Sequence, residues 1–430
     1  MNLFSTRRQA PVVTFREALF AGQAPDGGLY MPTDFPPLPI DALAQCADFR
    51  ETAQTALERL LGDEFSPLGV ETVVERAYHF APALRDFDDL TILELFHGPT
   101  LSFKDFGAQF MAKSMGWFLR SESREITILV ATSGDTGSAV AHAYHRVEGV
   151  GIVLLYPSGK VSALQERQFT TLGDNVHALE VDGTFDDCQA LVKTAFADRE
   201  LSAKARLSSA NSINIGRLIP QALYYLWAIL RLTQRDRPLV CVPSGNFGNL
   251  CAGLFAGQWG LPVARFIAAV NANSVIPEYL QSGVYRPRPS LHTLSNAMDV
   301  GNPSNWERIR TLFGDDHARI AERLWSVSIS DELTLETMRA VYQRTGYVAD
   351  PHTAVGIAAV ERFRSERPAG RRPTLVLSTA HPGKFPEVVE RALGIDIPLP
   401  PALQACLAKP KTATPLANAY DELKDFVWNL

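Results

Sequence analysis

Cysteine is scarce in this chain, which has only five thiols among 430 residues and no CxxC pair. Widely spaced cysteines without a pairing signature are typical of reduced thiols and argue against a disulfide framework. Zinc binding is equally unsupported by the sequence. His142 and His145 lie three residues apart, but no Cys, Asp or Glu completes a recognisable ligand set around them. We therefore expect no metal site.

Long apolar runs are also missing. The most apolar stretch, 218–232, is interrupted by Pro220, Gln221 and Arg231, whereas a membrane span needs about 20 mainly apolar residues. Arg7 and Arg8 are not followed by the apolar segment of a signal peptide. The net charge of −6 opposes a general affinity for nucleic acid or for an anionic membrane. We expect a cytoplasmic protein whose partner is a small-molecule substrate rather than nucleic acid or membrane.

The first part of the chain has the pattern of a small helical unit. Thr14 and Glu17 form a capping-box pattern at the start of a helix, and Gly22 supplies a stop at its end. Further helices are predicted over 49–61 and from Ser66-Pro67 onward, where proline occupies a first helical position. The charged, proline-containing stretch 82–89 follows. We therefore predict an N-terminal helical domain over 1–81 and a second region over 82–430.

Beyond residue 89 the pattern changes to short apolar runs that alternate with helical stretches. Strands are predicted over 126–131, 152–155, 176–181, 239–242, 266–270 and 375–378. Helices are predicted over 138–147, 185–197, 218–232, 249–257, 333–344 and 353–364. This alternation predicts an α/β fold with parallel sheets flanked by helices, in which ligands bind beyond the carboxyl ends of the strands.

Three predicted strands run directly into small polar turns. These turns are TSGDTGS at 132–138, PSGNFGN at 243–249 and TAHPG at 379–383. Glycine permits close backbone approach, and the free N–H groups at a helix start attract anions. Each turn alone could be an ordinary loop with helix-capping residues, but three together favour an anion site. Walker A and GxGxxG sequences are absent here, which disfavours nucleotide binding and a dinucleotide oxidoreductase.

Two cationic residues stand beside candidate binding groups. Lys104 lies between aromatic residues, and burial there would lower the pKa of its amine and make it a nucleophile for Schiff-base chemistry. The alternative is a surface lysine paired with Asp105. Arg217 ends the segment NSINIGR at 211–217, whose hydroxyl, amide and guanidinium groups suit a carboxylate or phosphate ester. The alternative there is a capped helix start with a solvated arginine.

Taken together, these motifs resemble those of the threonine synthase family. HGPTLSFKDFG at 97–107, ATSGDTGSA at 131–139, SANSIN at 209–214, PSGNFG at 243–248 and TAHP at 379–382 occur in the order found in that family, and DGGLYMP at 26–32 adds to the match. The resemblance covers about 12–385. It implies a fold type II pyridoxal-phosphate enzyme of the longer branch, which has a helical N-terminal domain. Residues 82–430 would then form two α/β subdomains with a C-terminal extension.

The resemblance also implies roles for individual residues. Lys104 resembles the lysine that holds pyridoxal 5'-phosphate and acts in catalysis. The predicted cofactor ligands are Lys104, Asp135, Gly245, Asn246, Phe247, Gly248, Asn249 and Thr379, of which Thr379 would meet the pyridine nitrogen. The predicted substrate ligands are Thr132, Ser133, Gly134 and Thr136, and, around a substrate phosphate, Asn211, Ser212, Asn214 and Arg217. His381 is expected to be structural, since the GxSxG elbow of a hydrolase is absent.

The activity implied by the resemblance is conversion of O-phospho-L-homoserine and water to L-threonine and phosphate, by β,γ-elimination and replacement in threonine biosynthesis. Related cofactor-dependent lyases that act on phosphoserine, phosphothreonine or unphosphorylated threonine share the same cofactor motifs. A cofactor-binding sensor without catalysis is a further alternative, which the retention of Lys104 and all three turns disfavours. The sequence does not predict an oligomeric state.

Overall fold

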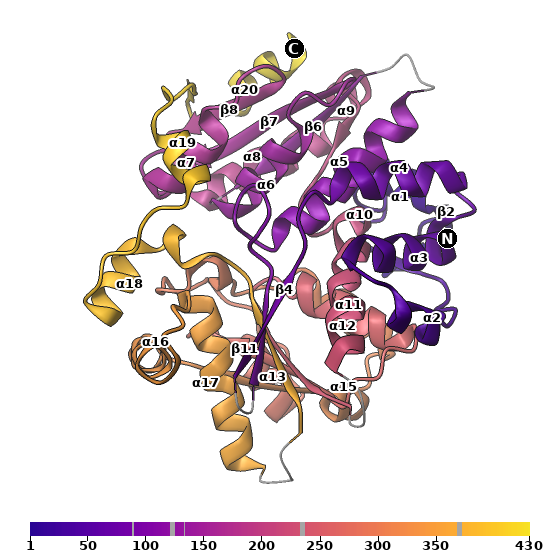
Figure 1. Cartoon of the computed structure of the whole chain (residues 1–430). Helices are drawn as coiled ribbons and strands as arrows, with labels where there is room; N and C mark the ends of the chain where they lie inside the picture. The colour runs from indigo at the N-terminus through magenta and orange to yellow at the C-terminus, as the bar shows by residue number, and fades with distance from the viewer. Residues whose placement is uncertain (88–89, 121–124, 133, 233–236, 368–371) are drawn as a thin grey trace.

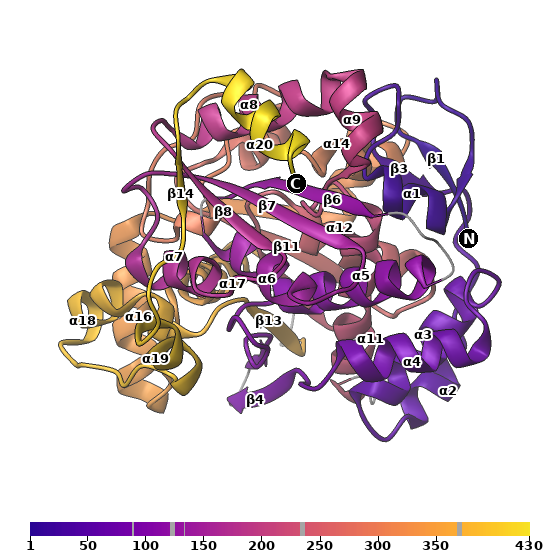
Figure 2. The ribbon, with the colours of Figure 1, turned by 90° about the horizontal axis from the view of Figure 1, so that it is seen from above.

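Two β-sheets flanked by helices form most of the molecule, as Figures 1 and 2 show. The computed structural model describes residues 1–430 apart from 88–89, 121–124, 133, 233–236 and 368–371. The larger sheet has the order β12 (Leu324–Ser328), β11 (Arg265–Val270), β10 (Leu239–Pro243), β13 (Thr374–Ser378), β5 (Leu90–Glu94) and β4 (Ala83–Phe87). The smaller sheet has the order β14 (Thr414–Leu416), β8 (Val176–Val181), β7 (Val150–Pro157), β6 (Ile126–Ala131) and β9 (Leu207–Ser208).

The described strands of both sheets pair in parallel, except that the edge strand β4 is antiparallel to β5. Parallel strands need helices on both faces of the sheet. Figure 2 shows α8 (Phe185–Ala197) on one face of the smaller sheet and α6 (Asp135–Tyr144) and α7 (Ala163–Thr170) on the other. The prediction of a fold with parallel sheets flanked by helices is confirmed.

Strand positions follow the predictions closely, because buried parallel strands are continuous apolar runs. The predicted strands 126–131 and 176–181 and the helix 185–197 agree with β6, β8 and α8 at both ends. Other helices begin or end a few residues away, such as α6, α12 (Gly248–Gln258), α16 (Asp331–Thr345) and α17 (Pro351–Glu366).

The helix predicted over 218–232 ends at the predicted residue but begins at Ala222, four residues later than predicted. The chain instead forms α10 (Ile215–Leu218), a 3-10 turn η1 (Ile219–Gln221) and α11 (Ala222–Leu232). Pro220 lies within the turn and has no N–H to continue an α-helix, so the regular hydrogen-bond ladder is interrupted there. The break separates the short helix that contains Arg217 from the long apolar helix that follows.

The N-terminal segment contains more than the predicted helices. Its helices are α1 (Phe15–Ala21), α2 (Ile40–Gln45), α3 (Phe49–Leu61) and α4 (Pro67–Ala77), and the Thr14–Glu17 capping box is present. A small antiparallel sheet of β1 (Asn2–Ser5), β2 (Val13–Thr14) and β3 (Tyr30–Pro32) joins them. Strands this short bury too few alternating side chains to give a periodic signal. The predicted boundary stretch 82–89 contains β4, and Asp89 lies outside the described residues.

The apolar core does not stop at the end of the N-terminal segment. One cluster of buried side chains continues from α1, α3 and α4 through α5 (Lys104–Leu119) and α11 to β6 and β10. Phe15 packs against Phe110, and Phe49 packs against Phe106, both on α5. The N-terminal segment therefore supports α5, the helix that begins at Lys104.

Helices complete the rest of the described chain. They are α9 (Arg199–Ala205), α13 (Val275–Ser282), η2 (Asn296–Met298), α14 (Trp306–Leu312), α15 (His317–Arg323), η3 (Pro382–Lys384), α18 (Pro386–Leu393), α19 (Pro401–Leu407) and α20 (Tyr420–Trp428). Among the described residues, no helix is long and apolar enough to cross a membrane.

The C-terminal segment joins the two sheets. After α18 and α19, it adds β14 to the edge of the smaller sheet beside β8 and ends in α20, which packs on α8 and α9 (Figures 1 and 2). Lys424 pairs with Asp198 at 2.8 Å, and the Tyr420 hydroxyl donates to the same carboxylate at 2.8 Å. Leu423, on α20 itself, is fully buried. The segment therefore closes an edge that the smaller sheet would otherwise expose.

Candidate active site

The three polar turns follow the carboxyl ends of β6, β10 and β13, where ligands of parallel sheets bind. The Phe103 N–H donates to the carbonyl of Thr379 at 2.9 Å, and Ser102 forms an isolated bridge with Ala380. These backbone bonds place the start of α5 beside the third turn. Lys104, the first residue of α5, is thereby held next to residues that lie far away in the sequence.

The Lys104 side chain is largely buried, with 15% of its surface exposed. Its Nζ lies 3.5 Å from Oδ2 of Asp135 and 5.3 Å from the centre of the Phe103 ring. Burial lowers the pKa of the Lys104 amine, which the charge of Asp135 opposes and the charges of Lys384 and Arg217 reinforce. These features fit a nucleophilic amine.

The alternative of a surface pair between Lys104 and Asp105 is wrong. Asp105 is fully buried and accepts hydrogen bonds from the N–H and the hydroxyl of Thr100, at 2.9 and 2.7 Å. Burial raises the pKa of the Asp105 carboxyl to about 6, against those hydrogen bonds. Asp105 therefore shapes the loop before α5 rather than neutralising Lys104.

Asp135 is held by residues that the sequence motifs did not single out. Its Oδ1 lies 2.6 Å from Nζ of Lys384 and accepts a hydrogen bond from Nε2 of Gln165 at 2.9 Å. Burial would raise the pKa of Asp135, but the charges of Lys384 and Lys104 outweigh burial and lower it. Asp135 is therefore a buried carboxylate between the side-chain nitrogens of Lys384 and Lys104. Lys384 lies two residues after the TAHP motif, so proximity in sequence was the only available signal.

The remaining groups of the 132–136 turn have different surroundings. Thr132 Oγ1 accepts the N–H groups of Gly134 and Gly137 at 3.1 and 2.8 Å, so its hydroxyl braces the turn. Gly134 has φ 142°, and a Cβ there would lie 2.6 Å from Oε1 of Gln165. Thr136 is half-buried without a hydrogen bond to a described residue. Ser133 lies outside the described residues.

The turn after β10 forms a cradle of unpaired backbone donors. Within the described residues, the backbone N–H groups of Gly245, Asn246, Phe247 and Gly248 have no hydrogen-bond partner. Phe247 adopts φ 58° directly before α12, so these groups precede a helix start. Side-chain Nδ2 of the buried Asn249 is also unpartnered, although its Oδ1 accepts from Tyr224 and Tyr225. Unpaired donors that precede a helix start are the donor set that a phosphate group needs.

The 211–217 segment lies against this cradle. Ser212 Oγ accepts Nδ2 of Asn246 at 3.2 Å and Nδ2 of Asn305 at 3.3 Å, which leaves the hydroxyl proton free to donate elsewhere. The Asn211 side chain has no hydrogen bond to a described residue. Asn214 is different: its amide bonds Leu19, Ser209 and Gly216, so it fixes the segment.

Arg217 is a buried cation, with 2% of its surface exposed, so the alternative of a solvated arginine is wrong. One amine of its guanidinium donates to the carbonyl of Ala210 at 2.6 Å, and Nε has no partner. The structure shows no ion pair between Arg217 and any described carboxylate. Burial lowers the pKa of Arg217 to about 10. A buried guanidinium without an acidic partner favours binding of an anionic ligand.

Thr379 and His381 belong to the third turn. Thr379 is a buried residue, and its hydroxyl has no hydrogen bond to a described residue, so it can bond a ligand. His381 Nδ1 accepts the N–H of Gly383 at 3.0 Å and caps η3, a structural role as predicted. Sequence reasoning missed Arg308, which is fully buried and donates to the carbonyls of Tyr30, Ser212 and Ile213. An arginine inside a helix gives no sequence signal for such a role.

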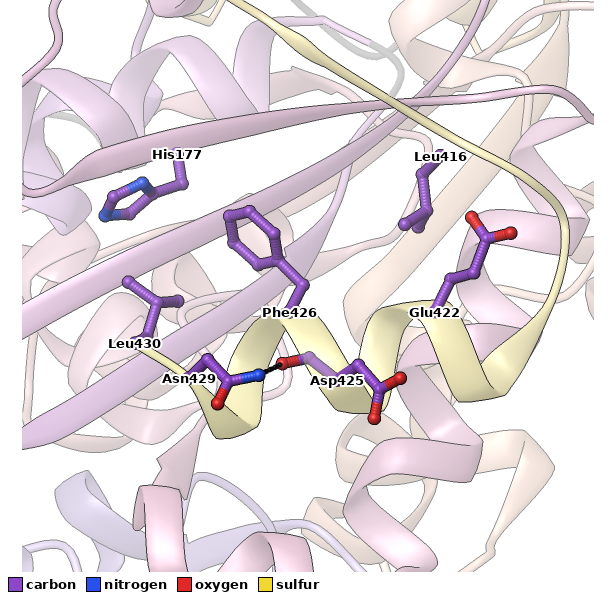
Figure 3. A pocket seen from close by; sticks show the side chains of 7 residues that line it. All are labelled: His177, Leu416, Glu422, Asp425, Phe426, Asn429 and Leu430. Carbon is purple, nitrogen blue, oxygen red and sulfur yellow. Dashed lines mark hydrogen bonds between the residues drawn. The ribbon is translucent and has the colours of Figure 1, made fainter.

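A surface hollow elsewhere on the molecule contains none of the predicted site residues. It lies between β8 and α20 and is lined by His177, Leu416, Glu422, Asp425, Phe426, Asn429 and Leu430 (Figure 3). The His177 and Phe426 rings meet edge to face at 5.8 Å. This hollow belongs to the packing of the C-terminal helix.

Comparison with known proteins accounts for this arrangement. A family model described as pyridoxal-phosphate dependent enzyme matches residues 80–379, and the models for the N terminus and the C-terminal part of threonine synthase match 2–78 and 353–427. Threonine synthase from Serratia marcescens is 44% identical over the full length of both chains. The chain belongs to the threonine synthase family. It is therefore a pyridoxal-phosphate-dependent lyase that serves threonine biosynthesis.

Solved structures of the threonine synthase family have the same fold. Pyridoxal-phosphate-bound threonine synthase from Brucella melitensis is 36% identical and aligns with a TM-score of 0.92 over 100% of this chain and 99% of that chain. Threonine synthase from Escherichia coli is 41% identical, with a TM-score of 0.90 over the full length of both chains. Fold type II is thus confirmed for this chain.

The residues present fit the cofactor of the threonine synthase family. Pyridoxal phosphate requires a lysine amine, a phosphate cradle and a group opposite the pyridine nitrogen. Lys104 is buried with its amine pKa lowered, and the unpaired donors of 245–249 suit a phosphate. Thr379 is a buried residue whose carbonyl bonds the N–H of Phe103, directly before α5. The donor set of this structure therefore matches the cofactor that the family uses.

Proposed function

We propose that the substrate is O-phospho-L-homoserine, which reacts with water to give L-threonine and phosphate. The observation that carries this proposal is the buried Arg217 guanidinium without an acidic partner, on the same segment as the Ser212 hydroxyl. Arg217, Ser212 and Asn211 would bind the phosphate ester of the substrate. A buried cation of this kind disfavours an unphosphorylated substrate such as threonine, because the guanidinium would stay unpaired.

Lys104 would hold pyridoxal phosphate covalently through Nζ, with the cofactor phosphate in the 245–249 turn and the Thr379 hydroxyl at the pyridine nitrogen. The bound cofactor supplies an electron sink for negative charge that develops on the substrate carbon atoms. The Asn249 amide and the N–H groups of Gly245 to Gly248 would donate to the cofactor phosphate. Asp135 supports Lys104 from the side of the smaller sheet.

Proton transfer would then rest on the amine of Lys104. With substrate in the site, Nζ of Lys104 would take the proton from Cα of the substrate, because its lowered pKa keeps the amine neutral more readily than that of an exposed lysine. Loss of a β proton accompanies departure of the γ phosphate, with Arg217 and Ser212 stabilising the charge on the leaving group. Protonation at Cγ and addition of water at Cβ complete the balance of one water consumed and one phosphate released.

An assay with two substrates in parallel tests the proposal. Purified enzyme is given O-phospho-L-homoserine or O-phospho-L-threonine, and threonine, 2-oxobutyrate and phosphate are measured in each reaction. We expect threonine and phosphate in equal amounts from the first substrate. Release of 2-oxobutyrate from phosphothreonine, without threonine from phosphohomoserine, would contradict the proposal and indicate a phospholyase.

Two further proposals concern the domain boundaries and the cellular location of the protein. We propose that residues 1–81 form an N-terminal domain that supports α5, and that 82–430 form the catalytic region. The packing of Phe15 and Phe49 on α5 supports this role. We also propose a cytoplasmic location, which is supported by five free cysteines, four of them buried.

A further inference from the structure

Lys384 is a fully buried ammonium group on η3 with two fixed partners. Its Nζ lies 2.6 Å from Oδ1 of Asp135 and donates to the carbonyl of Thr100 at 2.9 Å. Asp135 begins α6 on the side of the smaller sheet, whereas Lys384 follows β13 of the larger sheet. Thr100 precedes Lys104 on the loop into α5. Lys384 therefore connects the segment after β13, the start of α6 and the loop before α5. It is not one of the predicted ligands of the site.

The geometry ranks the two lysines around Asp135. Oδ1 is 2.6 Å from Lys384, while Oδ2 is 3.5 Å from Lys104. The ammonium group of Lys384 balances the charge of the buried Asp135 carboxylate. The Gln165 amide donates to the same oxygen, Oδ1, at 2.9 Å. Lys104 is left with the longer and weaker contact. A buried carboxylate with Lys104 as its only cationic partner would instead stabilise the ammonium form of Lys104.

We propose that Lys384 is a positioning residue of the active site, whose ammonium group fixes and neutralises the Asp135 carboxylate so that Lys104 is free to act as an amine. The inference rests on the proposed role of Lys104 as the cofactor lysine. It explains why a lysine is kept fully buried so close to a second lysine. Like charges this near each other are costly unless a shared carboxylate compensates them.

Other charged groups near Lys104 fit the same account. Burial lowers the pKa of the Lys104 amine most strongly, and the charge of Asp135 on α6 raises it. The charges of Lys384 on η3 and Arg217 on α10 lower it further. Asp105 on α5 is bonded to Thr100 rather than to Lys104. Removal of Lys384 would therefore leave Asp135 as the dominant charge facing Lys104.

The test measures the reactivity of Lys104 directly in the full-length chain after its cofactor has been removed. Acetic anhydride at limiting concentration labels neutral amines, and peptide mass analysis gives the labelling rate of Lys104 between pH 6 and 10. We expect Lys384→Met to slow labelling of Lys104 about tenfold at a given pH and to shift its midpoint upward, since loss of a close charge changes an amine pKa by about one unit or more. Addition of pyridoxal phosphate, followed by absorbance, should show correspondingly slower cofactor capture.

Three further variants separate charge balance from folding. Lys384→Arg keeps the positive charge and should label Lys104 at nearly the wild-type rate. The double variant Asp135→Asn/Lys384→Met removes both charges and should restore the rate that Lys384→Met loses. Lys113→Met is the matched control. Lys113 lies on α5, the helix that begins at Lys104, is half-buried, and donates only to the carbonyl of Ala143. It should leave labelling of Lys104 unchanged.

Equal labelling of Lys104 in folded Lys384→Met and wild type would overturn the proposal, and so would a double variant that fails to recover. If Lys384→Met does not fold, the double variant and Lys384→Arg are each compared with the wild type, and tenfold slower labelling of Lys104 in either of them overturns the proposal. Borohydride reduction of the wild-type holoenzyme is run beside them. Attachment of the cofactor to another lysine would refute the assignment of Lys104, whereas attachment to Lys104 with no effect of Lys384→Met would refute only the role of Lys384.

Discussion

At the scale of the residue, Arg217 is the buried group that we propose selects the substrate. Its guanidinium has no acidic partner among the described residues, so a phosphate ester would be its natural counter-ion. A hydrogen bond to a charged group contributes roughly 1.5–3 kcal/mol, so Arg217→Ala should weaken phosphohomoserine binding about tenfold to a hundredfold. Arg217→Lys should recover only part of this loss, because it lacks the planar fork. Titration of each variant with phosphohomoserine, followed by cofactor absorbance, measures the change.

An unphosphorylated amino acid is the control for Arg217. L-Threonine binds without a phosphate, so its affinity should hardly change in Arg217→Ala. Equal losses for both ligands would assign Arg217 to the substrate carboxylate or to the support of the Ala210 carbonyl, which it already bonds.

Lys104 makes the most direct prediction at this scale. Lys104→Ala should abolish both covalent attachment of the cofactor and turnover, because no other amine occupies the start of α5. Borohydride reduction of the wild-type enzyme, followed by peptide mass analysis, should place the cofactor on the peptide that contains Lys104. A cofactor recovered on a different peptide would contradict the assignment.

Asp105 predicts a pH dependence of stability. Burial raises the pKa of its carboxyl from 3.8 to about 6, so the folded state binds this proton more tightly than the unfolded state. The stability that this proton confers is present below about pH 4 and is lost as pH rises to about 6, on the order of 3 kcal/mol in all. Denaturant unfolding of wild type and Asp105→Asn across this range should show that slope only in the wild type. Parallel curves for the two proteins would contradict the prediction.

At the scale of the element, the start of α12 combines two requirements in one turn. Its N–H groups are free for a phosphate, and its glycines allow close packing. A Cβ at Gly245 would lie 2.7 Å from Cα of Met298 and 3.0 Å from the carbonyl oxygen of Ala297. These contacts are with backbone atoms, which cannot rotate away. The turn therefore depends on the neighbouring η2 segment for its shape.

Gly245→Ala should displace this turn and weaken cofactor binding, as equilibrium dialysis with pyridoxal phosphate would show. Gly257, near the end of the same helix, is the matched control because a Cβ there meets nothing within 4 Å. Gly257→Ala should keep wild-type affinity and gain up to about 1 kcal/mol of stability from helix propensity. Wild-type affinity in a folded Gly245→Ala variant would remove the turn from the proposed cofactor site.

At the scale of the whole molecule, the C-terminal segment holds the outer edge of the smaller sheet. Leu423 of α20 is fully buried against α8 and α9, whereas Leu430 is 51% exposed beside the hollow in Figure 3. Leu423→Ala should cost about 2–5 kcal/mol of unfolding free energy, because a buried leucine leaves a cavity. Leu430→Ala should change stability by no more than about 0.5 kcal/mol. Urea unfolding measures both, and similar losses would contradict a specific role for α20.

The sequence by itself determined the elements whose signals are local. Continuous apolar runs predicted β6 and β8, and a capping box predicted the start of α1, because period and capping depend on residues a few positions apart. Glycine-containing turns after three strands predicted the three candidate binding turns, which follow β6, β10 and β13 in the structure. The start of the helix predicted over 218–232 was placed four residues too early, because the apolar pattern continues through Pro220, which has no N–H for an α-helix.

Only the tertiary structure decided how charges in the site are paired. Lys104 contacts Asp135 rather than its neighbour Asp105, and Lys384 binds the same carboxylate from the other sheet. Burial of Arg217 was likewise invisible in a segment that reads as a capped helix start. The physical reason is that pairing and desolvation depend on distances between segments far apart in the chain, which the fold sets and local sequence patterns do not contain.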